Sequence, residues 1–594
     1  MSGSDFTWKV GGAQGEGIDS TGEIFALTLH RLGYYIYTYR HFMSVIKGGH
    51  TNYKVRVSPA MRRHRGDGLD LLVAFDQGSI DFSLSEMSPG SAIIYDSTAF
   101  EAHIPADRDI TLVPIPLTQM ARDMGMVIMK NMVAIGASAA LVGLPRDAFE
   151  SYLQERFGKK GGSIVETNRK VLAAGYDHAL ANTLWRHPLP ELPAASRGKR
   201  RLFLHGNDAI ALGAVAAGCR IVAAYPITPA TEILYSVLKL LPQYGGVVLQ
   251  AEDEIAACQM AIGAGYAGVR AMTSTSGPGF SLMSESLGLA GASETPLVIV
   301  DVMRAGPSTG MPTKTEQADA FHAIYSAHGE IQRIVLTPAT VEDAFYGMQR
   351  AFNLADQYQV PVIVLIDLIL GLSKQTVEVE DIDFNRIAID RGKLMTTQAE
   401  VDAVVARLGE YKRYELTEDG VSPRAMPGLQ QAVHMVLSYE HDESGNEMEE
   451  RGMRVKQTRK RFGKMKTLDT SWSLRRTGPE NPDLLLVGWG SSEGQLAEAR
   501  EELSRGGLQV AHLQVGALHP LPAEALRKEI EAAGRVLVFE TNYEGQLLEL
   551  IKQKIGHFDN VQSRLKFDGD PFYVAEVVAM AQAVTPTPNP QEVA

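Results

Sequence analysis

The stretch Gln250–Gly268, QAEDEIAACQMAIGAGYAG, decides the fold of this chain. Three carboxylates, Glu252, Asp253 and Glu254, lead into residues that are almost all small or apolar. Acidic residues are favoured in the first turn of a helix, where the macrodipole is positive, so the pattern predicts a buried helix that begins here. A solvated helix start explains one or two of the acids. A carboxyl group that is buried against closely packed small residues has a raised pKa and can instead share a proton with a ligand nitrogen.

Short buried strands surround this helix in the sequence. They are Ile221–Ala224, Val247–Gln250, Ala271–Thr275, Leu297–Val302, Arg333–Leu336 and Val362–Asp367. Helical segments alternate with them, which predicts a doubly wound α/β sheet. Ligands of such sheets bind at the carboxyl ends of the strands, so the loops that follow the strands are candidate binding elements.

Three of these loops are rich in glycine or proline. In YPITPATE (225–232), Thr228 is expected either to cap the next helix or to give its hydroxyl to a bound carboxylate or carbonyl. TSTSGPG (273–279) lets the backbone approach a ligand closely. RAGPSTGMPT (304–313) begins with the only strong cation of the three loops. Arg304 suits a bidentate contact with a carboxylate, and a structural ion pair is the alternative.

Two further α/β units are predicted on either side of this domain. The first contains a strand at Phe6–Val10, a helix through Leu32 and a long helix over Met120–Leu141. The third opens with the strand Leu484–Gly488. The expected boundaries are 1–185 for the first unit, 186–200 for a proline-rich linker, 201–373 for the second unit, 374–480 for a charged connecting segment, 481–582 for the third unit and 583–594 for a disordered tail.

A glycine loop, GGAQGEG (11–17), follows the first strand and opens a helix, a context that suits phosphate binding. Its glycines are Gly12, Gly15 and Gly17, and their spacing is not G-x-G-x-x-G. The next apolar segment ends in Arg40 instead of a ribose-binding acid, which disfavours a nicotinamide dinucleotide. Lys47–His50, KGGH, is a basic loop suited to phosphates or another anion. A tight turn without a ligand is the alternative.

Composition narrows the class of protein. The chain has 594 residues with 57 basic and 70 acidic side chains, and its net charge of −13 argues against a nucleic-acid partner. Two cysteines, Cys219 and Cys258, cannot hold an iron–sulfur cluster or form a disulfide framework. The N-terminal residues lack the features of a secretory signal, and no apolar run has membrane-spanning length. A cytoplasmic enzyme is expected.

Together, the motifs resemble the fused gamma–alpha subunit of the 2-oxoacid:ferredoxin (acceptor) oxidoreductases over nearly the whole chain. The matching elements are GGAQGEG (11–17), KGGHTNYKVRVS (47–58), GNDAIALGAVAAG (206–218), YPITPATEI (225–233), QAEDEIAA (250–257), TSTSGPGFSLMSE (273–285), RAGPSTGMPT (304–313), VGWGSSEG (487–494) and VFETNYEGQL (538–547). The resemblance implies three α/β units: a gamma-like domain, a thiamine-enzyme pyrimidine-binding domain and a transketolase C-terminal-like domain.

The resemblance also implies roles for individual residues. Glu254 would activate thiamine diphosphate, because Gly263 follows it by nine residues (263 − 254 = 9) as in thiamine enzymes. Glu252 is the second choice, and Glu252 and Asp253 are expected to serve the helix start or a subunit boundary. Thr228 and Arg304 would hold the 2-oxoacid carboxylate. The thiamine side would include Pro226, Ile227, Ser276, Gly277 and Pro278, and the coenzyme A side Gly12, Gly15, Gly17, Lys47 and His50.

The chain lacks two parts of such an enzyme. It has no cysteine cluster, and Gly66-Asp67-Gly68 is not followed by the asparagine that completes a magnesium–diphosphate motif. No metal site is therefore expected in this chain. The resemblance implies a beta subunit that supplies the diphosphate site, Mg²⁺ and a [4Fe-4S] cluster. The expected assembly is a dimer of alpha–beta pairs that exchanges electrons with ferredoxin.

The expected reaction is the coenzyme A-dependent oxidation of 2-oxoglutarate to succinyl-CoA and CO₂, or the reverse reductive carboxylation. Pyruvate or a branched-chain 2-oxoacid is the alternative substrate. Lys47, His50 or a beta-subunit residue could supply the cation for the distal carboxylate of 2-oxoglutarate. The alternatives from other classes are an NAD(P)-dependent dehydrogenase and a non-catalytic acyl-CoA-binding scaffold.

Overall fold

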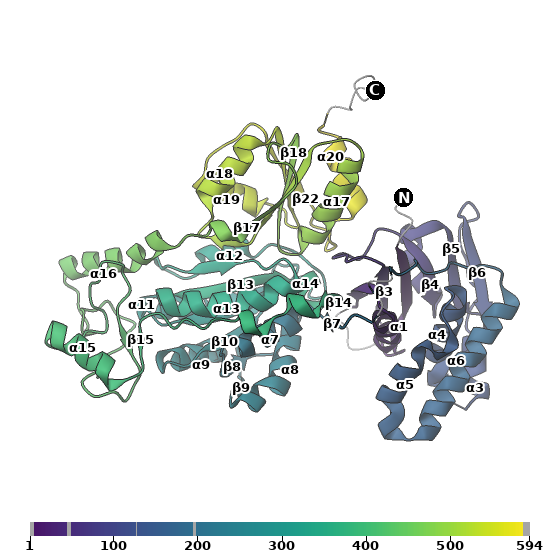
Figure 1. Cartoon of the computed structure of the whole chain (residues 1–594), viewed down its shortest axis with the longest axis horizontal. Coiled ribbons are helices and arrows are strands. Elements are labelled where there is room, and N and C mark those ends of the chain that lie inside the picture. Colours follow the sequence, from purple (N-terminus) through teal and green to yellow (C-terminus); the bar gives the residue numbers. More distant parts are fainter. Residues whose placement is uncertain (1–4, 44–48, 126, 194–195, 197, 586–594) are drawn as a thin grey trace. The chain divides into compact units, whose positions relative to one another are not determined.

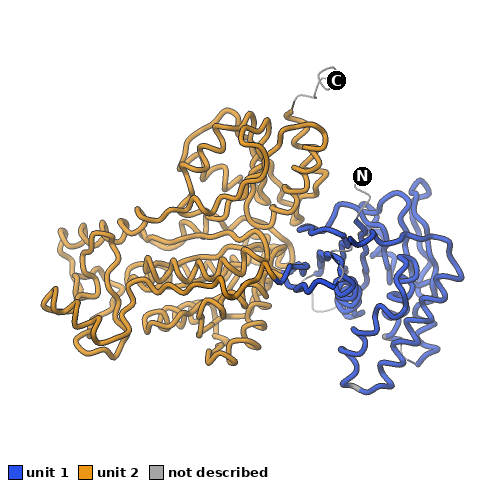
Figure 2. Tube along the Cα trace, viewed as in Figure 1, with its two compact units in different colours: residues 1–204, 372–379 blue, residues 205–371, 380–594 orange. Residues whose placement is uncertain are grey.

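The computed structural model describes residues 5–43, 49–125, 127–193, 196 and 198–585 (Figure 1). The chain divides into two compact units, shown in two colours in Figure 2. The first unit contains residues 1–204 and 372–379, and the second contains residues 205–371 and 380–594. The chain therefore returns to the first unit for one short segment after it has entered the second.

A mixed sheet forms the centre of the first unit. Its strands, in spatial order, are β6 (Ile110–Ile115), β5 (Met87–Asp96), β4 (Leu69–Ala74), β1 (Phe6–Ala13), β3 (His50–Ser58), β2 (Tyr35–His41), β14 (Gln375–Glu378) and β7 (Arg201–Leu204). The strands from β1 to β6 along this order are parallel, whereas β3 pairs antiparallel with both β1 and β2. The strand predicted at Phe6–Val10 is present as β1 and extends to Ala13, but β2 and β3 were not predicted.

The helices of the first unit are α1 (Ile18–Leu32), α2 (Gln77–Ser83), α3 (Leu117–Asp123), α4 (Lys130–Leu141), α5 (Glu150–Phe157) and α6 (Gly162–Asn182). The predicted continuous helix over Met120–Leu141 is wrong, because α3 ends at Asp123 and α4 begins at Lys130. Gly125 lies between them with φ of 102°, in the left-handed region that ends a helix.

Two strands from outside the predicted first domain complete its sheet. β7 pairs antiparallel with β14, and Gln375 of β14 pairs with Tyr37 of β2. The structure thus differs from the predicted boundaries of the second domain, 201 and 373, at both ends. The predicted linker also packs on the first unit, since the His187 N–H donates to the Leu141 carbonyl at 3.0 Å.

The second unit contains the predicted doubly wound sheet. Its strand order is β20 (Ala517–His519), β12 (Ile334–Leu336), β13 (Pro361–Asp367), β11 (Leu297–Met303), β10 (Ala271–Thr275), β8 (Ile221–Ala224) and β9 (Val247–Gln250). All of these strands are parallel except β20, which pairs antiparallel with β12. Each strand predicted for this sheet matches the structure to within one residue.

The helices associated with this sheet are α7 (Gly206–Ala216), α8 (Thr231–Leu240), α9 (Glu254–Tyr266), α10 (Gly277–Leu282), α11 (Ser284–Ala292), α12 (Ala320–Tyr325), α13 (Val341–Tyr358) and α14 (Leu368–Leu372). Ile262 of α9, Phe280 of α10 and Leu287 of α11 share a buried core with Ile299 of β11. This packing holds the start of α9 and the start of α10 close to the ends of the strands.

The remainder of the second unit has two parts (Figure 1). The connecting segment contains β15 (Leu394–Met395), α15 (Gln398–Leu408), β16 (Arg424–Ala425) and α16 (Arg451–Gly463). The C-terminal sheet has the order β17 (Leu474–Thr477), β19 (Val510–Val515), β18 (Leu484–Trp489), β21 (Arg535–Glu540) and β22 (Val561–Leu565). Its helices are α17 (Glu493–Arg505), α18 (Ala523–Ala532), α19 (Gln546–Lys554) and α20 (Val574–Gln582).

The predicted disordered tail falls almost entirely outside the described residues, which end at 585. No helix within the described ranges is long and apolar enough to cross a membrane.

Candidate functional site

The residues predicted to bind the ligand lie at the carboxyl ends of β8, β9, β10 and β11. From β8 the chain continues outward to β9, then returns to β10 and proceeds to β11 in the other direction. Such a reversal opens a crevice between the neighbouring strands, and ligands bind there in doubly wound sheets. The structure therefore brings four motifs to one edge of the sheet: Tyr225–Thr228, Gln250–Glu254, Ser276–Gly279 and Arg304.

Glu254 is the first residue of α9 and is only 5% exposed. Its carboxylate has no hydrogen bond or ion pair with any residue that the structure describes. A Cβ atom on Gly279 would lie 2.4 Å from Glu254 Oε1, so the carboxylate packs directly against the Gly279 backbone. Burial without a partner is costly for a carboxyl group, and a donor on a bound ligand would relieve that cost.

The other two acids of the stretch have different environments. The Asp253 carboxylate accepts a hydrogen bond from the Ala256 N–H at 2.8 Å and is the N-cap of α9. Glu252 is exposed. As predicted, Asp253 serves the helix start, and only Glu254 is buried at the strand ends.

The loop after β10 forms a cradle beside Glu254. Ser276 is the N-cap residue of α10, and its buried hydroxyl has no hydrogen-bond partner among the described residues. The Thr273 hydroxyl is likewise buried and unpaired within the described chain. Side chains on Gly277 and Gly279 would collide with the Asp319 and Glu254 carboxylates. One unpaired acid, unpaired hydroxyls and two glycines fit the flat, nitrogen-rich aminopyrimidine of thiamine diphosphate.

Arg304 and Thr228 meet at the same edge. The Arg304 Nη1 donates to the Thr228 carbonyl at 2.8 Å, which ties the loop after β11 to the loop after β8. Arg304 is 9% exposed, and its Nε has no hydrogen-bond partner in the described residues. Burial lowers the pKa of the guanidinium, and Asp319 acts in the opposite direction. A buried guanidinium with unused donors is suited to an incoming carboxylate.

The prediction that Thr228 caps the following helix is wrong. α8 begins at Thr231, its N-cap residue is Ala230, and no side chain caps it. The turn before the helix is closed instead by the Ala230 N–H, which donates to the Ile227 carbonyl at 2.8 Å. The Thr228 hydroxyl has no partner in the described chain, which leaves it available to a ligand.

Two carboxyl groups at the site were not identified from the sequence. Asp301 lies near the end of β11 and is fully buried, and neither carboxyl oxygen has a partner in the described residues. Asp319 precedes α12, and its Oδ2 would lie 2.6 Å from a Cβ on Gly277. Burial and then the charge of Asp319 raise the pKa of Asp301. The sequence feature that could have identified Asp301 is its position as the single acid in the apolar strand LVIVDVM.

The glycine loop of the first unit differs in detail from the prediction. β1 extends to Ala13, so Gly12 is a strand residue that pairs with Thr51 of β3. Gly15 and Gly17 have φ of 98° and 79° and form the turn before α1. The Ala13 N–H donates to Glu16 Oε2 at 2.8 Å, and Lys130 Nζ donates to Glu16 Oε1 at 2.7 Å. The loop's own glutamate therefore occupies one backbone donor that a phosphate would use.

His50 of the second predicted coenzyme A element lies next to the glycine loop. His50 is the first residue of β3 and pairs with Ala13 at the end of β1. Its ring centre is 4.5 Å from that of Phe82, and burial lowers the pKa of His50. Lys47 lies outside the described residues. Arg40 occupies the position at which a nicotinamide-dinucleotide site would have a ribose-binding acid. Its guanidinium pairs with the Asp19 carboxylate at 2.7 Å.

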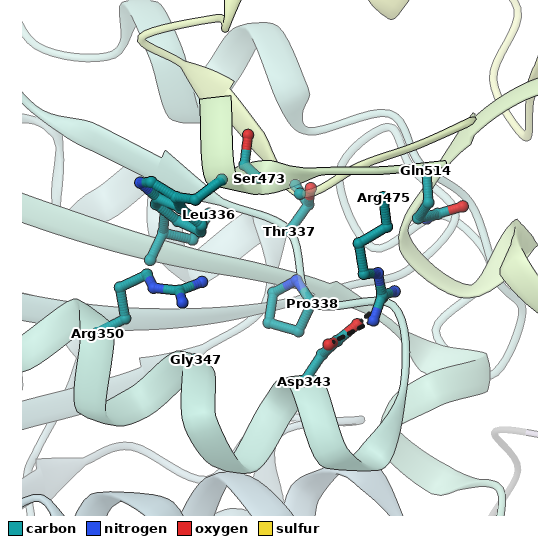
Figure 3. A pocket seen from close by; sticks show the side chains of 11 residues that line it. Leu336, Thr337, Pro338, Asp343, Gly347, Arg350, Ser473, Arg475 and Gln514 are labelled. Atoms are coloured by element: carbon teal, nitrogen blue, oxygen red, sulfur yellow. Dashed lines mark hydrogen bonds and ion pairs between the residues drawn. The ribbon is translucent and has the colours of Figure 1, made fainter. Parts of the chain in front are cut away.

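A small cavity at the end of β12 is a separate feature (Figure 3). It has a volume of about 70 Å³. Arg475 pairs with Asp343 at its rim, and the Arg350 guanidinium lies 3.6 Å from the centre of the Trp472 ring. The Thr337 N–H donates to the Gly516 carbonyl at 2.8 Å, so the C-terminal sheet closes this strand end.

In the described part of the chain, no three His, Cys, Asp or Glu side chains are grouped to hold a metal ion.

Comparison with protein families covers all three α/β parts. The family described as pyruvate flavodoxin/ferredoxin oxidoreductase, thiamine diphosphate-binding, matches residues 212–460. Pyruvate ferredoxin/flavodoxin oxidoreductase matches residues 7–178, and pyruvate:ferredoxin oxidoreductase core domain II matches residues 482–577. These matches confirm the predicted fold class and define a thiamine-type oxidoreductase.

Individual proteins agree with this class. The 2-oxoacid:ferredoxin oxidoreductase subunit alpha of Sulfolobus sp is 32% identical over 629 residues, which covers 95% of each chain. The 2-oxoglutarate oxidoreductase subunit KorA of Mycobacterium tuberculosis is 29% identical and covers 96% of this chain and 90% of its own. The structure of 2-oxoglutarate:ferredoxin oxidoreductase from Magnetococcus marinus, with 2-oxoglutarate, coenzyme A and succinyl-CoA bound, has a TM-score of 0.88. It is 36% identical, with 98% and 99% of the two chains covered. The chain belongs to the 2-oxoacid:ferredoxin oxidoreductase family.

Proposed function

We propose that this chain is the alpha subunit of a thiamine diphosphate-dependent 2-oxoglutarate:ferredoxin oxidoreductase. It would act in the coenzyme A-dependent conversion of 2-oxoglutarate to succinyl-CoA and CO₂, or in the reverse direction, with ferredoxin as electron partner. The observation that carries the proposal is the buried, unpaired carboxylate of Glu254 against Gly279, at the strand ends that also hold Arg304.

Each residue of the site has a defined task in this proposal. Thiamine diphosphate, when bound, supplies the carbon centre that attacks the keto group and stores its electrons. Glu254 holds a proton at the N1′ nitrogen of the aminopyrimidine ring. Arg304 and the Thr228 hydroxyl orient the substrate carboxylate beside that ring. Ser276 and Gly279, the two buried residues of the loop after β10, help to keep water from the reacting atoms, which strengthens each of these interactions.

A second protein chain is expected to complete the site. The edge strand β9 exposes Val247 and Leu249, and α9 exposes Ile255 and Met260. An apolar patch of this kind next to an active site is typical of a protein interface. We therefore propose that a beta subunit covers this face and brings the diphosphate site, Mg²⁺ and a [4Fe-4S] cluster. The chain would be inactive alone, and two alpha–beta pairs would associate in the cytoplasm.

The choice of 2-oxoglutarate rests on relatives named for that substrate. The cation for its distal carboxylate would be Lys47, His50 or a beta-subunit residue. Coenzyme A would use the Gly12–Gly17 and Lys47–His50 loops. Pyruvate and branched-chain 2-oxoacids are the alternative substrates.

The test is to co-express the chain with its beta subunit and assay several 2-oxoacids with a low-potential acceptor. We expect the highest kcat/KM with 2-oxoglutarate. Glu254→Ala should reduce decarboxylation at least about 100-fold, because it removes the proton partner of the cofactor, while the iron–sulfur absorbance of the complex is retained. Glu252→Ala is the matched control and should keep most of the activity. Full activity of the Glu254→Ala complex would refute the assignment.

A further inference from the structure

We propose that the C-terminal domain (residues 474–582) holds Arg304 in place for the substrate carboxylate, and that it does so mainly through Gln317. Gln317 is a positioning residue, which acts on the substrate through Arg304 and not by contact with it. The motifs at 487–494 and 538–547 have no task in the reaction proposed above, and the positioning of Arg304 supplies one. This role rests on the proposed function, in which Arg304 binds the 2-oxoacid.

Arg304 begins a loop that folds back on itself between β11 and α12 (residues 304–319, the substrate loop). The Ala305 N–H donates to the Lys314 carbonyl at 3.0 Å, and the Met311 N–H donates to the Ala305 carbonyl at 2.9 Å. These two bonds join the residue that follows Arg304 to the returning half of the loop. The position of Arg304 therefore depends on what holds that half.

Gln317, in the returning half, is bound to the C-terminal domain on all sides of its amide and backbone. It is 1% exposed, its Nε2 donates to the Trp489 carbonyl at 2.7 Å, and its Oε1 accepts from the Thr541 N–H at 3.0 Å. The Gln317 N–H donates to the Thr541 carbonyl at 2.7 Å, and its carbonyl accepts from Asn542 Nδ2 at 3.1 Å. One residue of the substrate loop thus forms four hydrogen bonds with the C-terminal domain. Such buried bonds are costly to lose, because the partner is left unsatisfied.

The partners of Gln317 are themselves fixed by the buried carboxylate of Glu540. Its Oε2 accepts from Asn542 Nδ2 at 3.0 Å and from Trp489 Nε1 at 3.3 Å. Gly490 has φ of 56°, and a Cβ atom there would lie 2.8 Å from Gln317 Nε2. A side chain at residue 490 would therefore displace the Gln317 amide. Both motifs of the C-terminal domain are thus arranged around Gln317.

A second attachment lies closer to Arg304 along the substrate loop. The Thr315 N–H donates to the Gly569 carbonyl at 3.3 Å. A Cβ atom on Gly569 would lie 3.0 Å from the Cβ of Lys314, so the two backbones are in close contact. Lys314 is the residue whose carbonyl accepts from Ala305, next to Arg304. A continuous series of contacts therefore leads from the C-terminal domain to Arg304.

A positioning role and a merely structural one predict different kinetics. If the substrate loop loosens, Arg304 binds the carboxylate less well in the ground state and the transition state alike. KM for the 2-oxoacid should then rise about tenfold while kcat changes little. Coenzyme A is assigned to the first unit, so its KM should not change. A structural role alone would reduce the amount of active complex, which lowers the apparent kcat and leaves both KM values unchanged.

The experiment compares Gln317→Met with the parent in the reconstituted complex, with the 2-oxoacid and coenzyme A varied in turn. Methionine has a similar length and removes both amide bonds. We expect KM for the 2-oxoacid to rise about tenfold, and KM for coenzyme A and kcat to stay within about twofold. Gln457→Met is the matched control. Gln457 is a buried glutamine on α16 that donates to the Tyr414 carbonyl at 3.1 Å, so its loss should lower stability and leave both KM values unchanged. An unchanged KM for the 2-oxoacid in Gln317→Met, or an equal rise in both KM values, would overturn the positioning role.

A double-mutant cycle with Arg304→Met tests whether Gln317 acts through Arg304. Arg304→Met alone should raise KM for the 2-oxoacid, and adding Gln317→Met should raise it little further, because the two changes act on the same contact. Effects that multiply would overturn the inference. An unchanged KM in Arg304→Met would refute the proposed function of Arg304 itself. A raised KM in Arg304→Met beside a parent KM in Gln317→Met would refute only the positioning role.

A second variant keeps the test independent of how well Gln317→Met assembles. Gly569→Ala retains the four bonds of Gln317, but its methyl group would lie 3.0 Å from the Cβ of Lys314 and from the Cε of Met311 and must move the substrate loop. We expect KM for the 2-oxoacid to rise and KM for coenzyme A to stay unchanged. Hydrogen–deuterium exchange supplies a readout without turnover: amides of residues 304–319 should exchange faster in both variants than in the parent or in Gln457→Met. Parent-like exchange of these amides in both variants would overturn the inference.

Discussion

The carboxylate of Glu254 packs against the α-carbon of Gly279, so that a Cβ atom at residue 279 would lie 2.4 Å from Oε1. The two residues are 25 positions apart (279 − 254 = 25). Glu254 begins α9 and Gly279 lies in α10, and both helices follow strands of the same sheet. The absence of a side chain at residue 279 is what allows an acid to be buried there. Because of this contact, the role proposed for Glu254 can be tested by a substitution at residue 279, which leaves the acid in place.

Gly279→Ala should therefore inactivate the complex while Glu254 is still present. The new methyl group must displace both the Thr275 hydroxyl and the Glu254 carboxylate, which would lie 2.2 and 2.4 Å away. We expect kcat to fall about 100-fold, since general acid–base groups contribute on that scale. Thermal unfolding should show that the fold survives. Gly288→Ala on α11, where a Cβ meets no atom within 4 Å, is the control and should remain active.

Gly263→Ala should make the chain alone more stable but weaken its binding to the beta subunit. Gly263 is exposed in the middle of α9, and a Cβ there meets no atom within 4 Å of this chain. Alanine favours the helix by about 0.5–1 kcal/mol, so the chain alone should become more stable towards urea. If the beta subunit packs on this face, its affinity should fall, as measured by sedimentation. Unchanged affinity would place the interface elsewhere.

Asp356→Asn should destabilise the second unit. The buried Asp356 carboxylate accepts from Arg270 at 2.9 Å, Arg391 at 2.7 Å and Arg424 at 3.1 Å. These bonds attach the connecting segment to α13 and to the start of β10. Loss of the charge leaves two buried guanidinium groups without a counter-ion, which costs about 3–5 kcal/mol. Arg391→Ala, at the partly exposed pair, should cost less than about 1 kcal/mol in the same denaturation experiment.

Acid should weaken the attachment of α16. Burial alone would raise the pKa of Glu294, but Lys460, whose Nζ lies 2.7 Å from Oε1, and Lys464 hold it well below its ordinary value. The folded state therefore binds fewer protons than the unfolded state in this range. The contribution to stability is complete above the ordinary glutamate pKa of 4.5 and is lost as pH falls below it.

Denaturant unfolding between pH 6 and about pH 3.5 checks this expectation. Glu294→Gln should be less stable than the parent at pH 6 and should lose less stability on acidification. An acid dependence identical to that of the parent would show that the buried pair does not contribute.

The sequence predicted the doubly wound sheet well because each strand is a short, fully buried apolar run with glycine or proline after it. The strand β3 was missed because its buried apolar residues alternate with Lys54 and Arg56, which are themselves buried among charged partners. β7 and β14 could not be predicted locally, since Leu204 pairs with Gln375 across 171 positions (375 − 204 = 171). Such pairings depend on the tertiary fold.

The candidate site was predictable to a similar extent. Glu254, Arg304 and Thr228 were found because their residue types stand out in apolar or glycine-rich surroundings. Asp301 was passed over as an interior residue of an apolar strand, although a single acid in such a strand requires an explanation. The capping role of Thr228 failed because Ala230, two residues later, takes the position before the helix.

The pairing of β7 with β14 has a consequence for a nicked chain. A protease that cuts within residues 186–193 severs the only covalent connection between Met1 and the start of β7. The two fragments should nevertheless co-purify, because β14, on the downstream fragment, remains hydrogen-bonded to β2 on the upstream one. Separation should then require a denaturant, and the same site offers a place to express the protein as two complementing polypeptides.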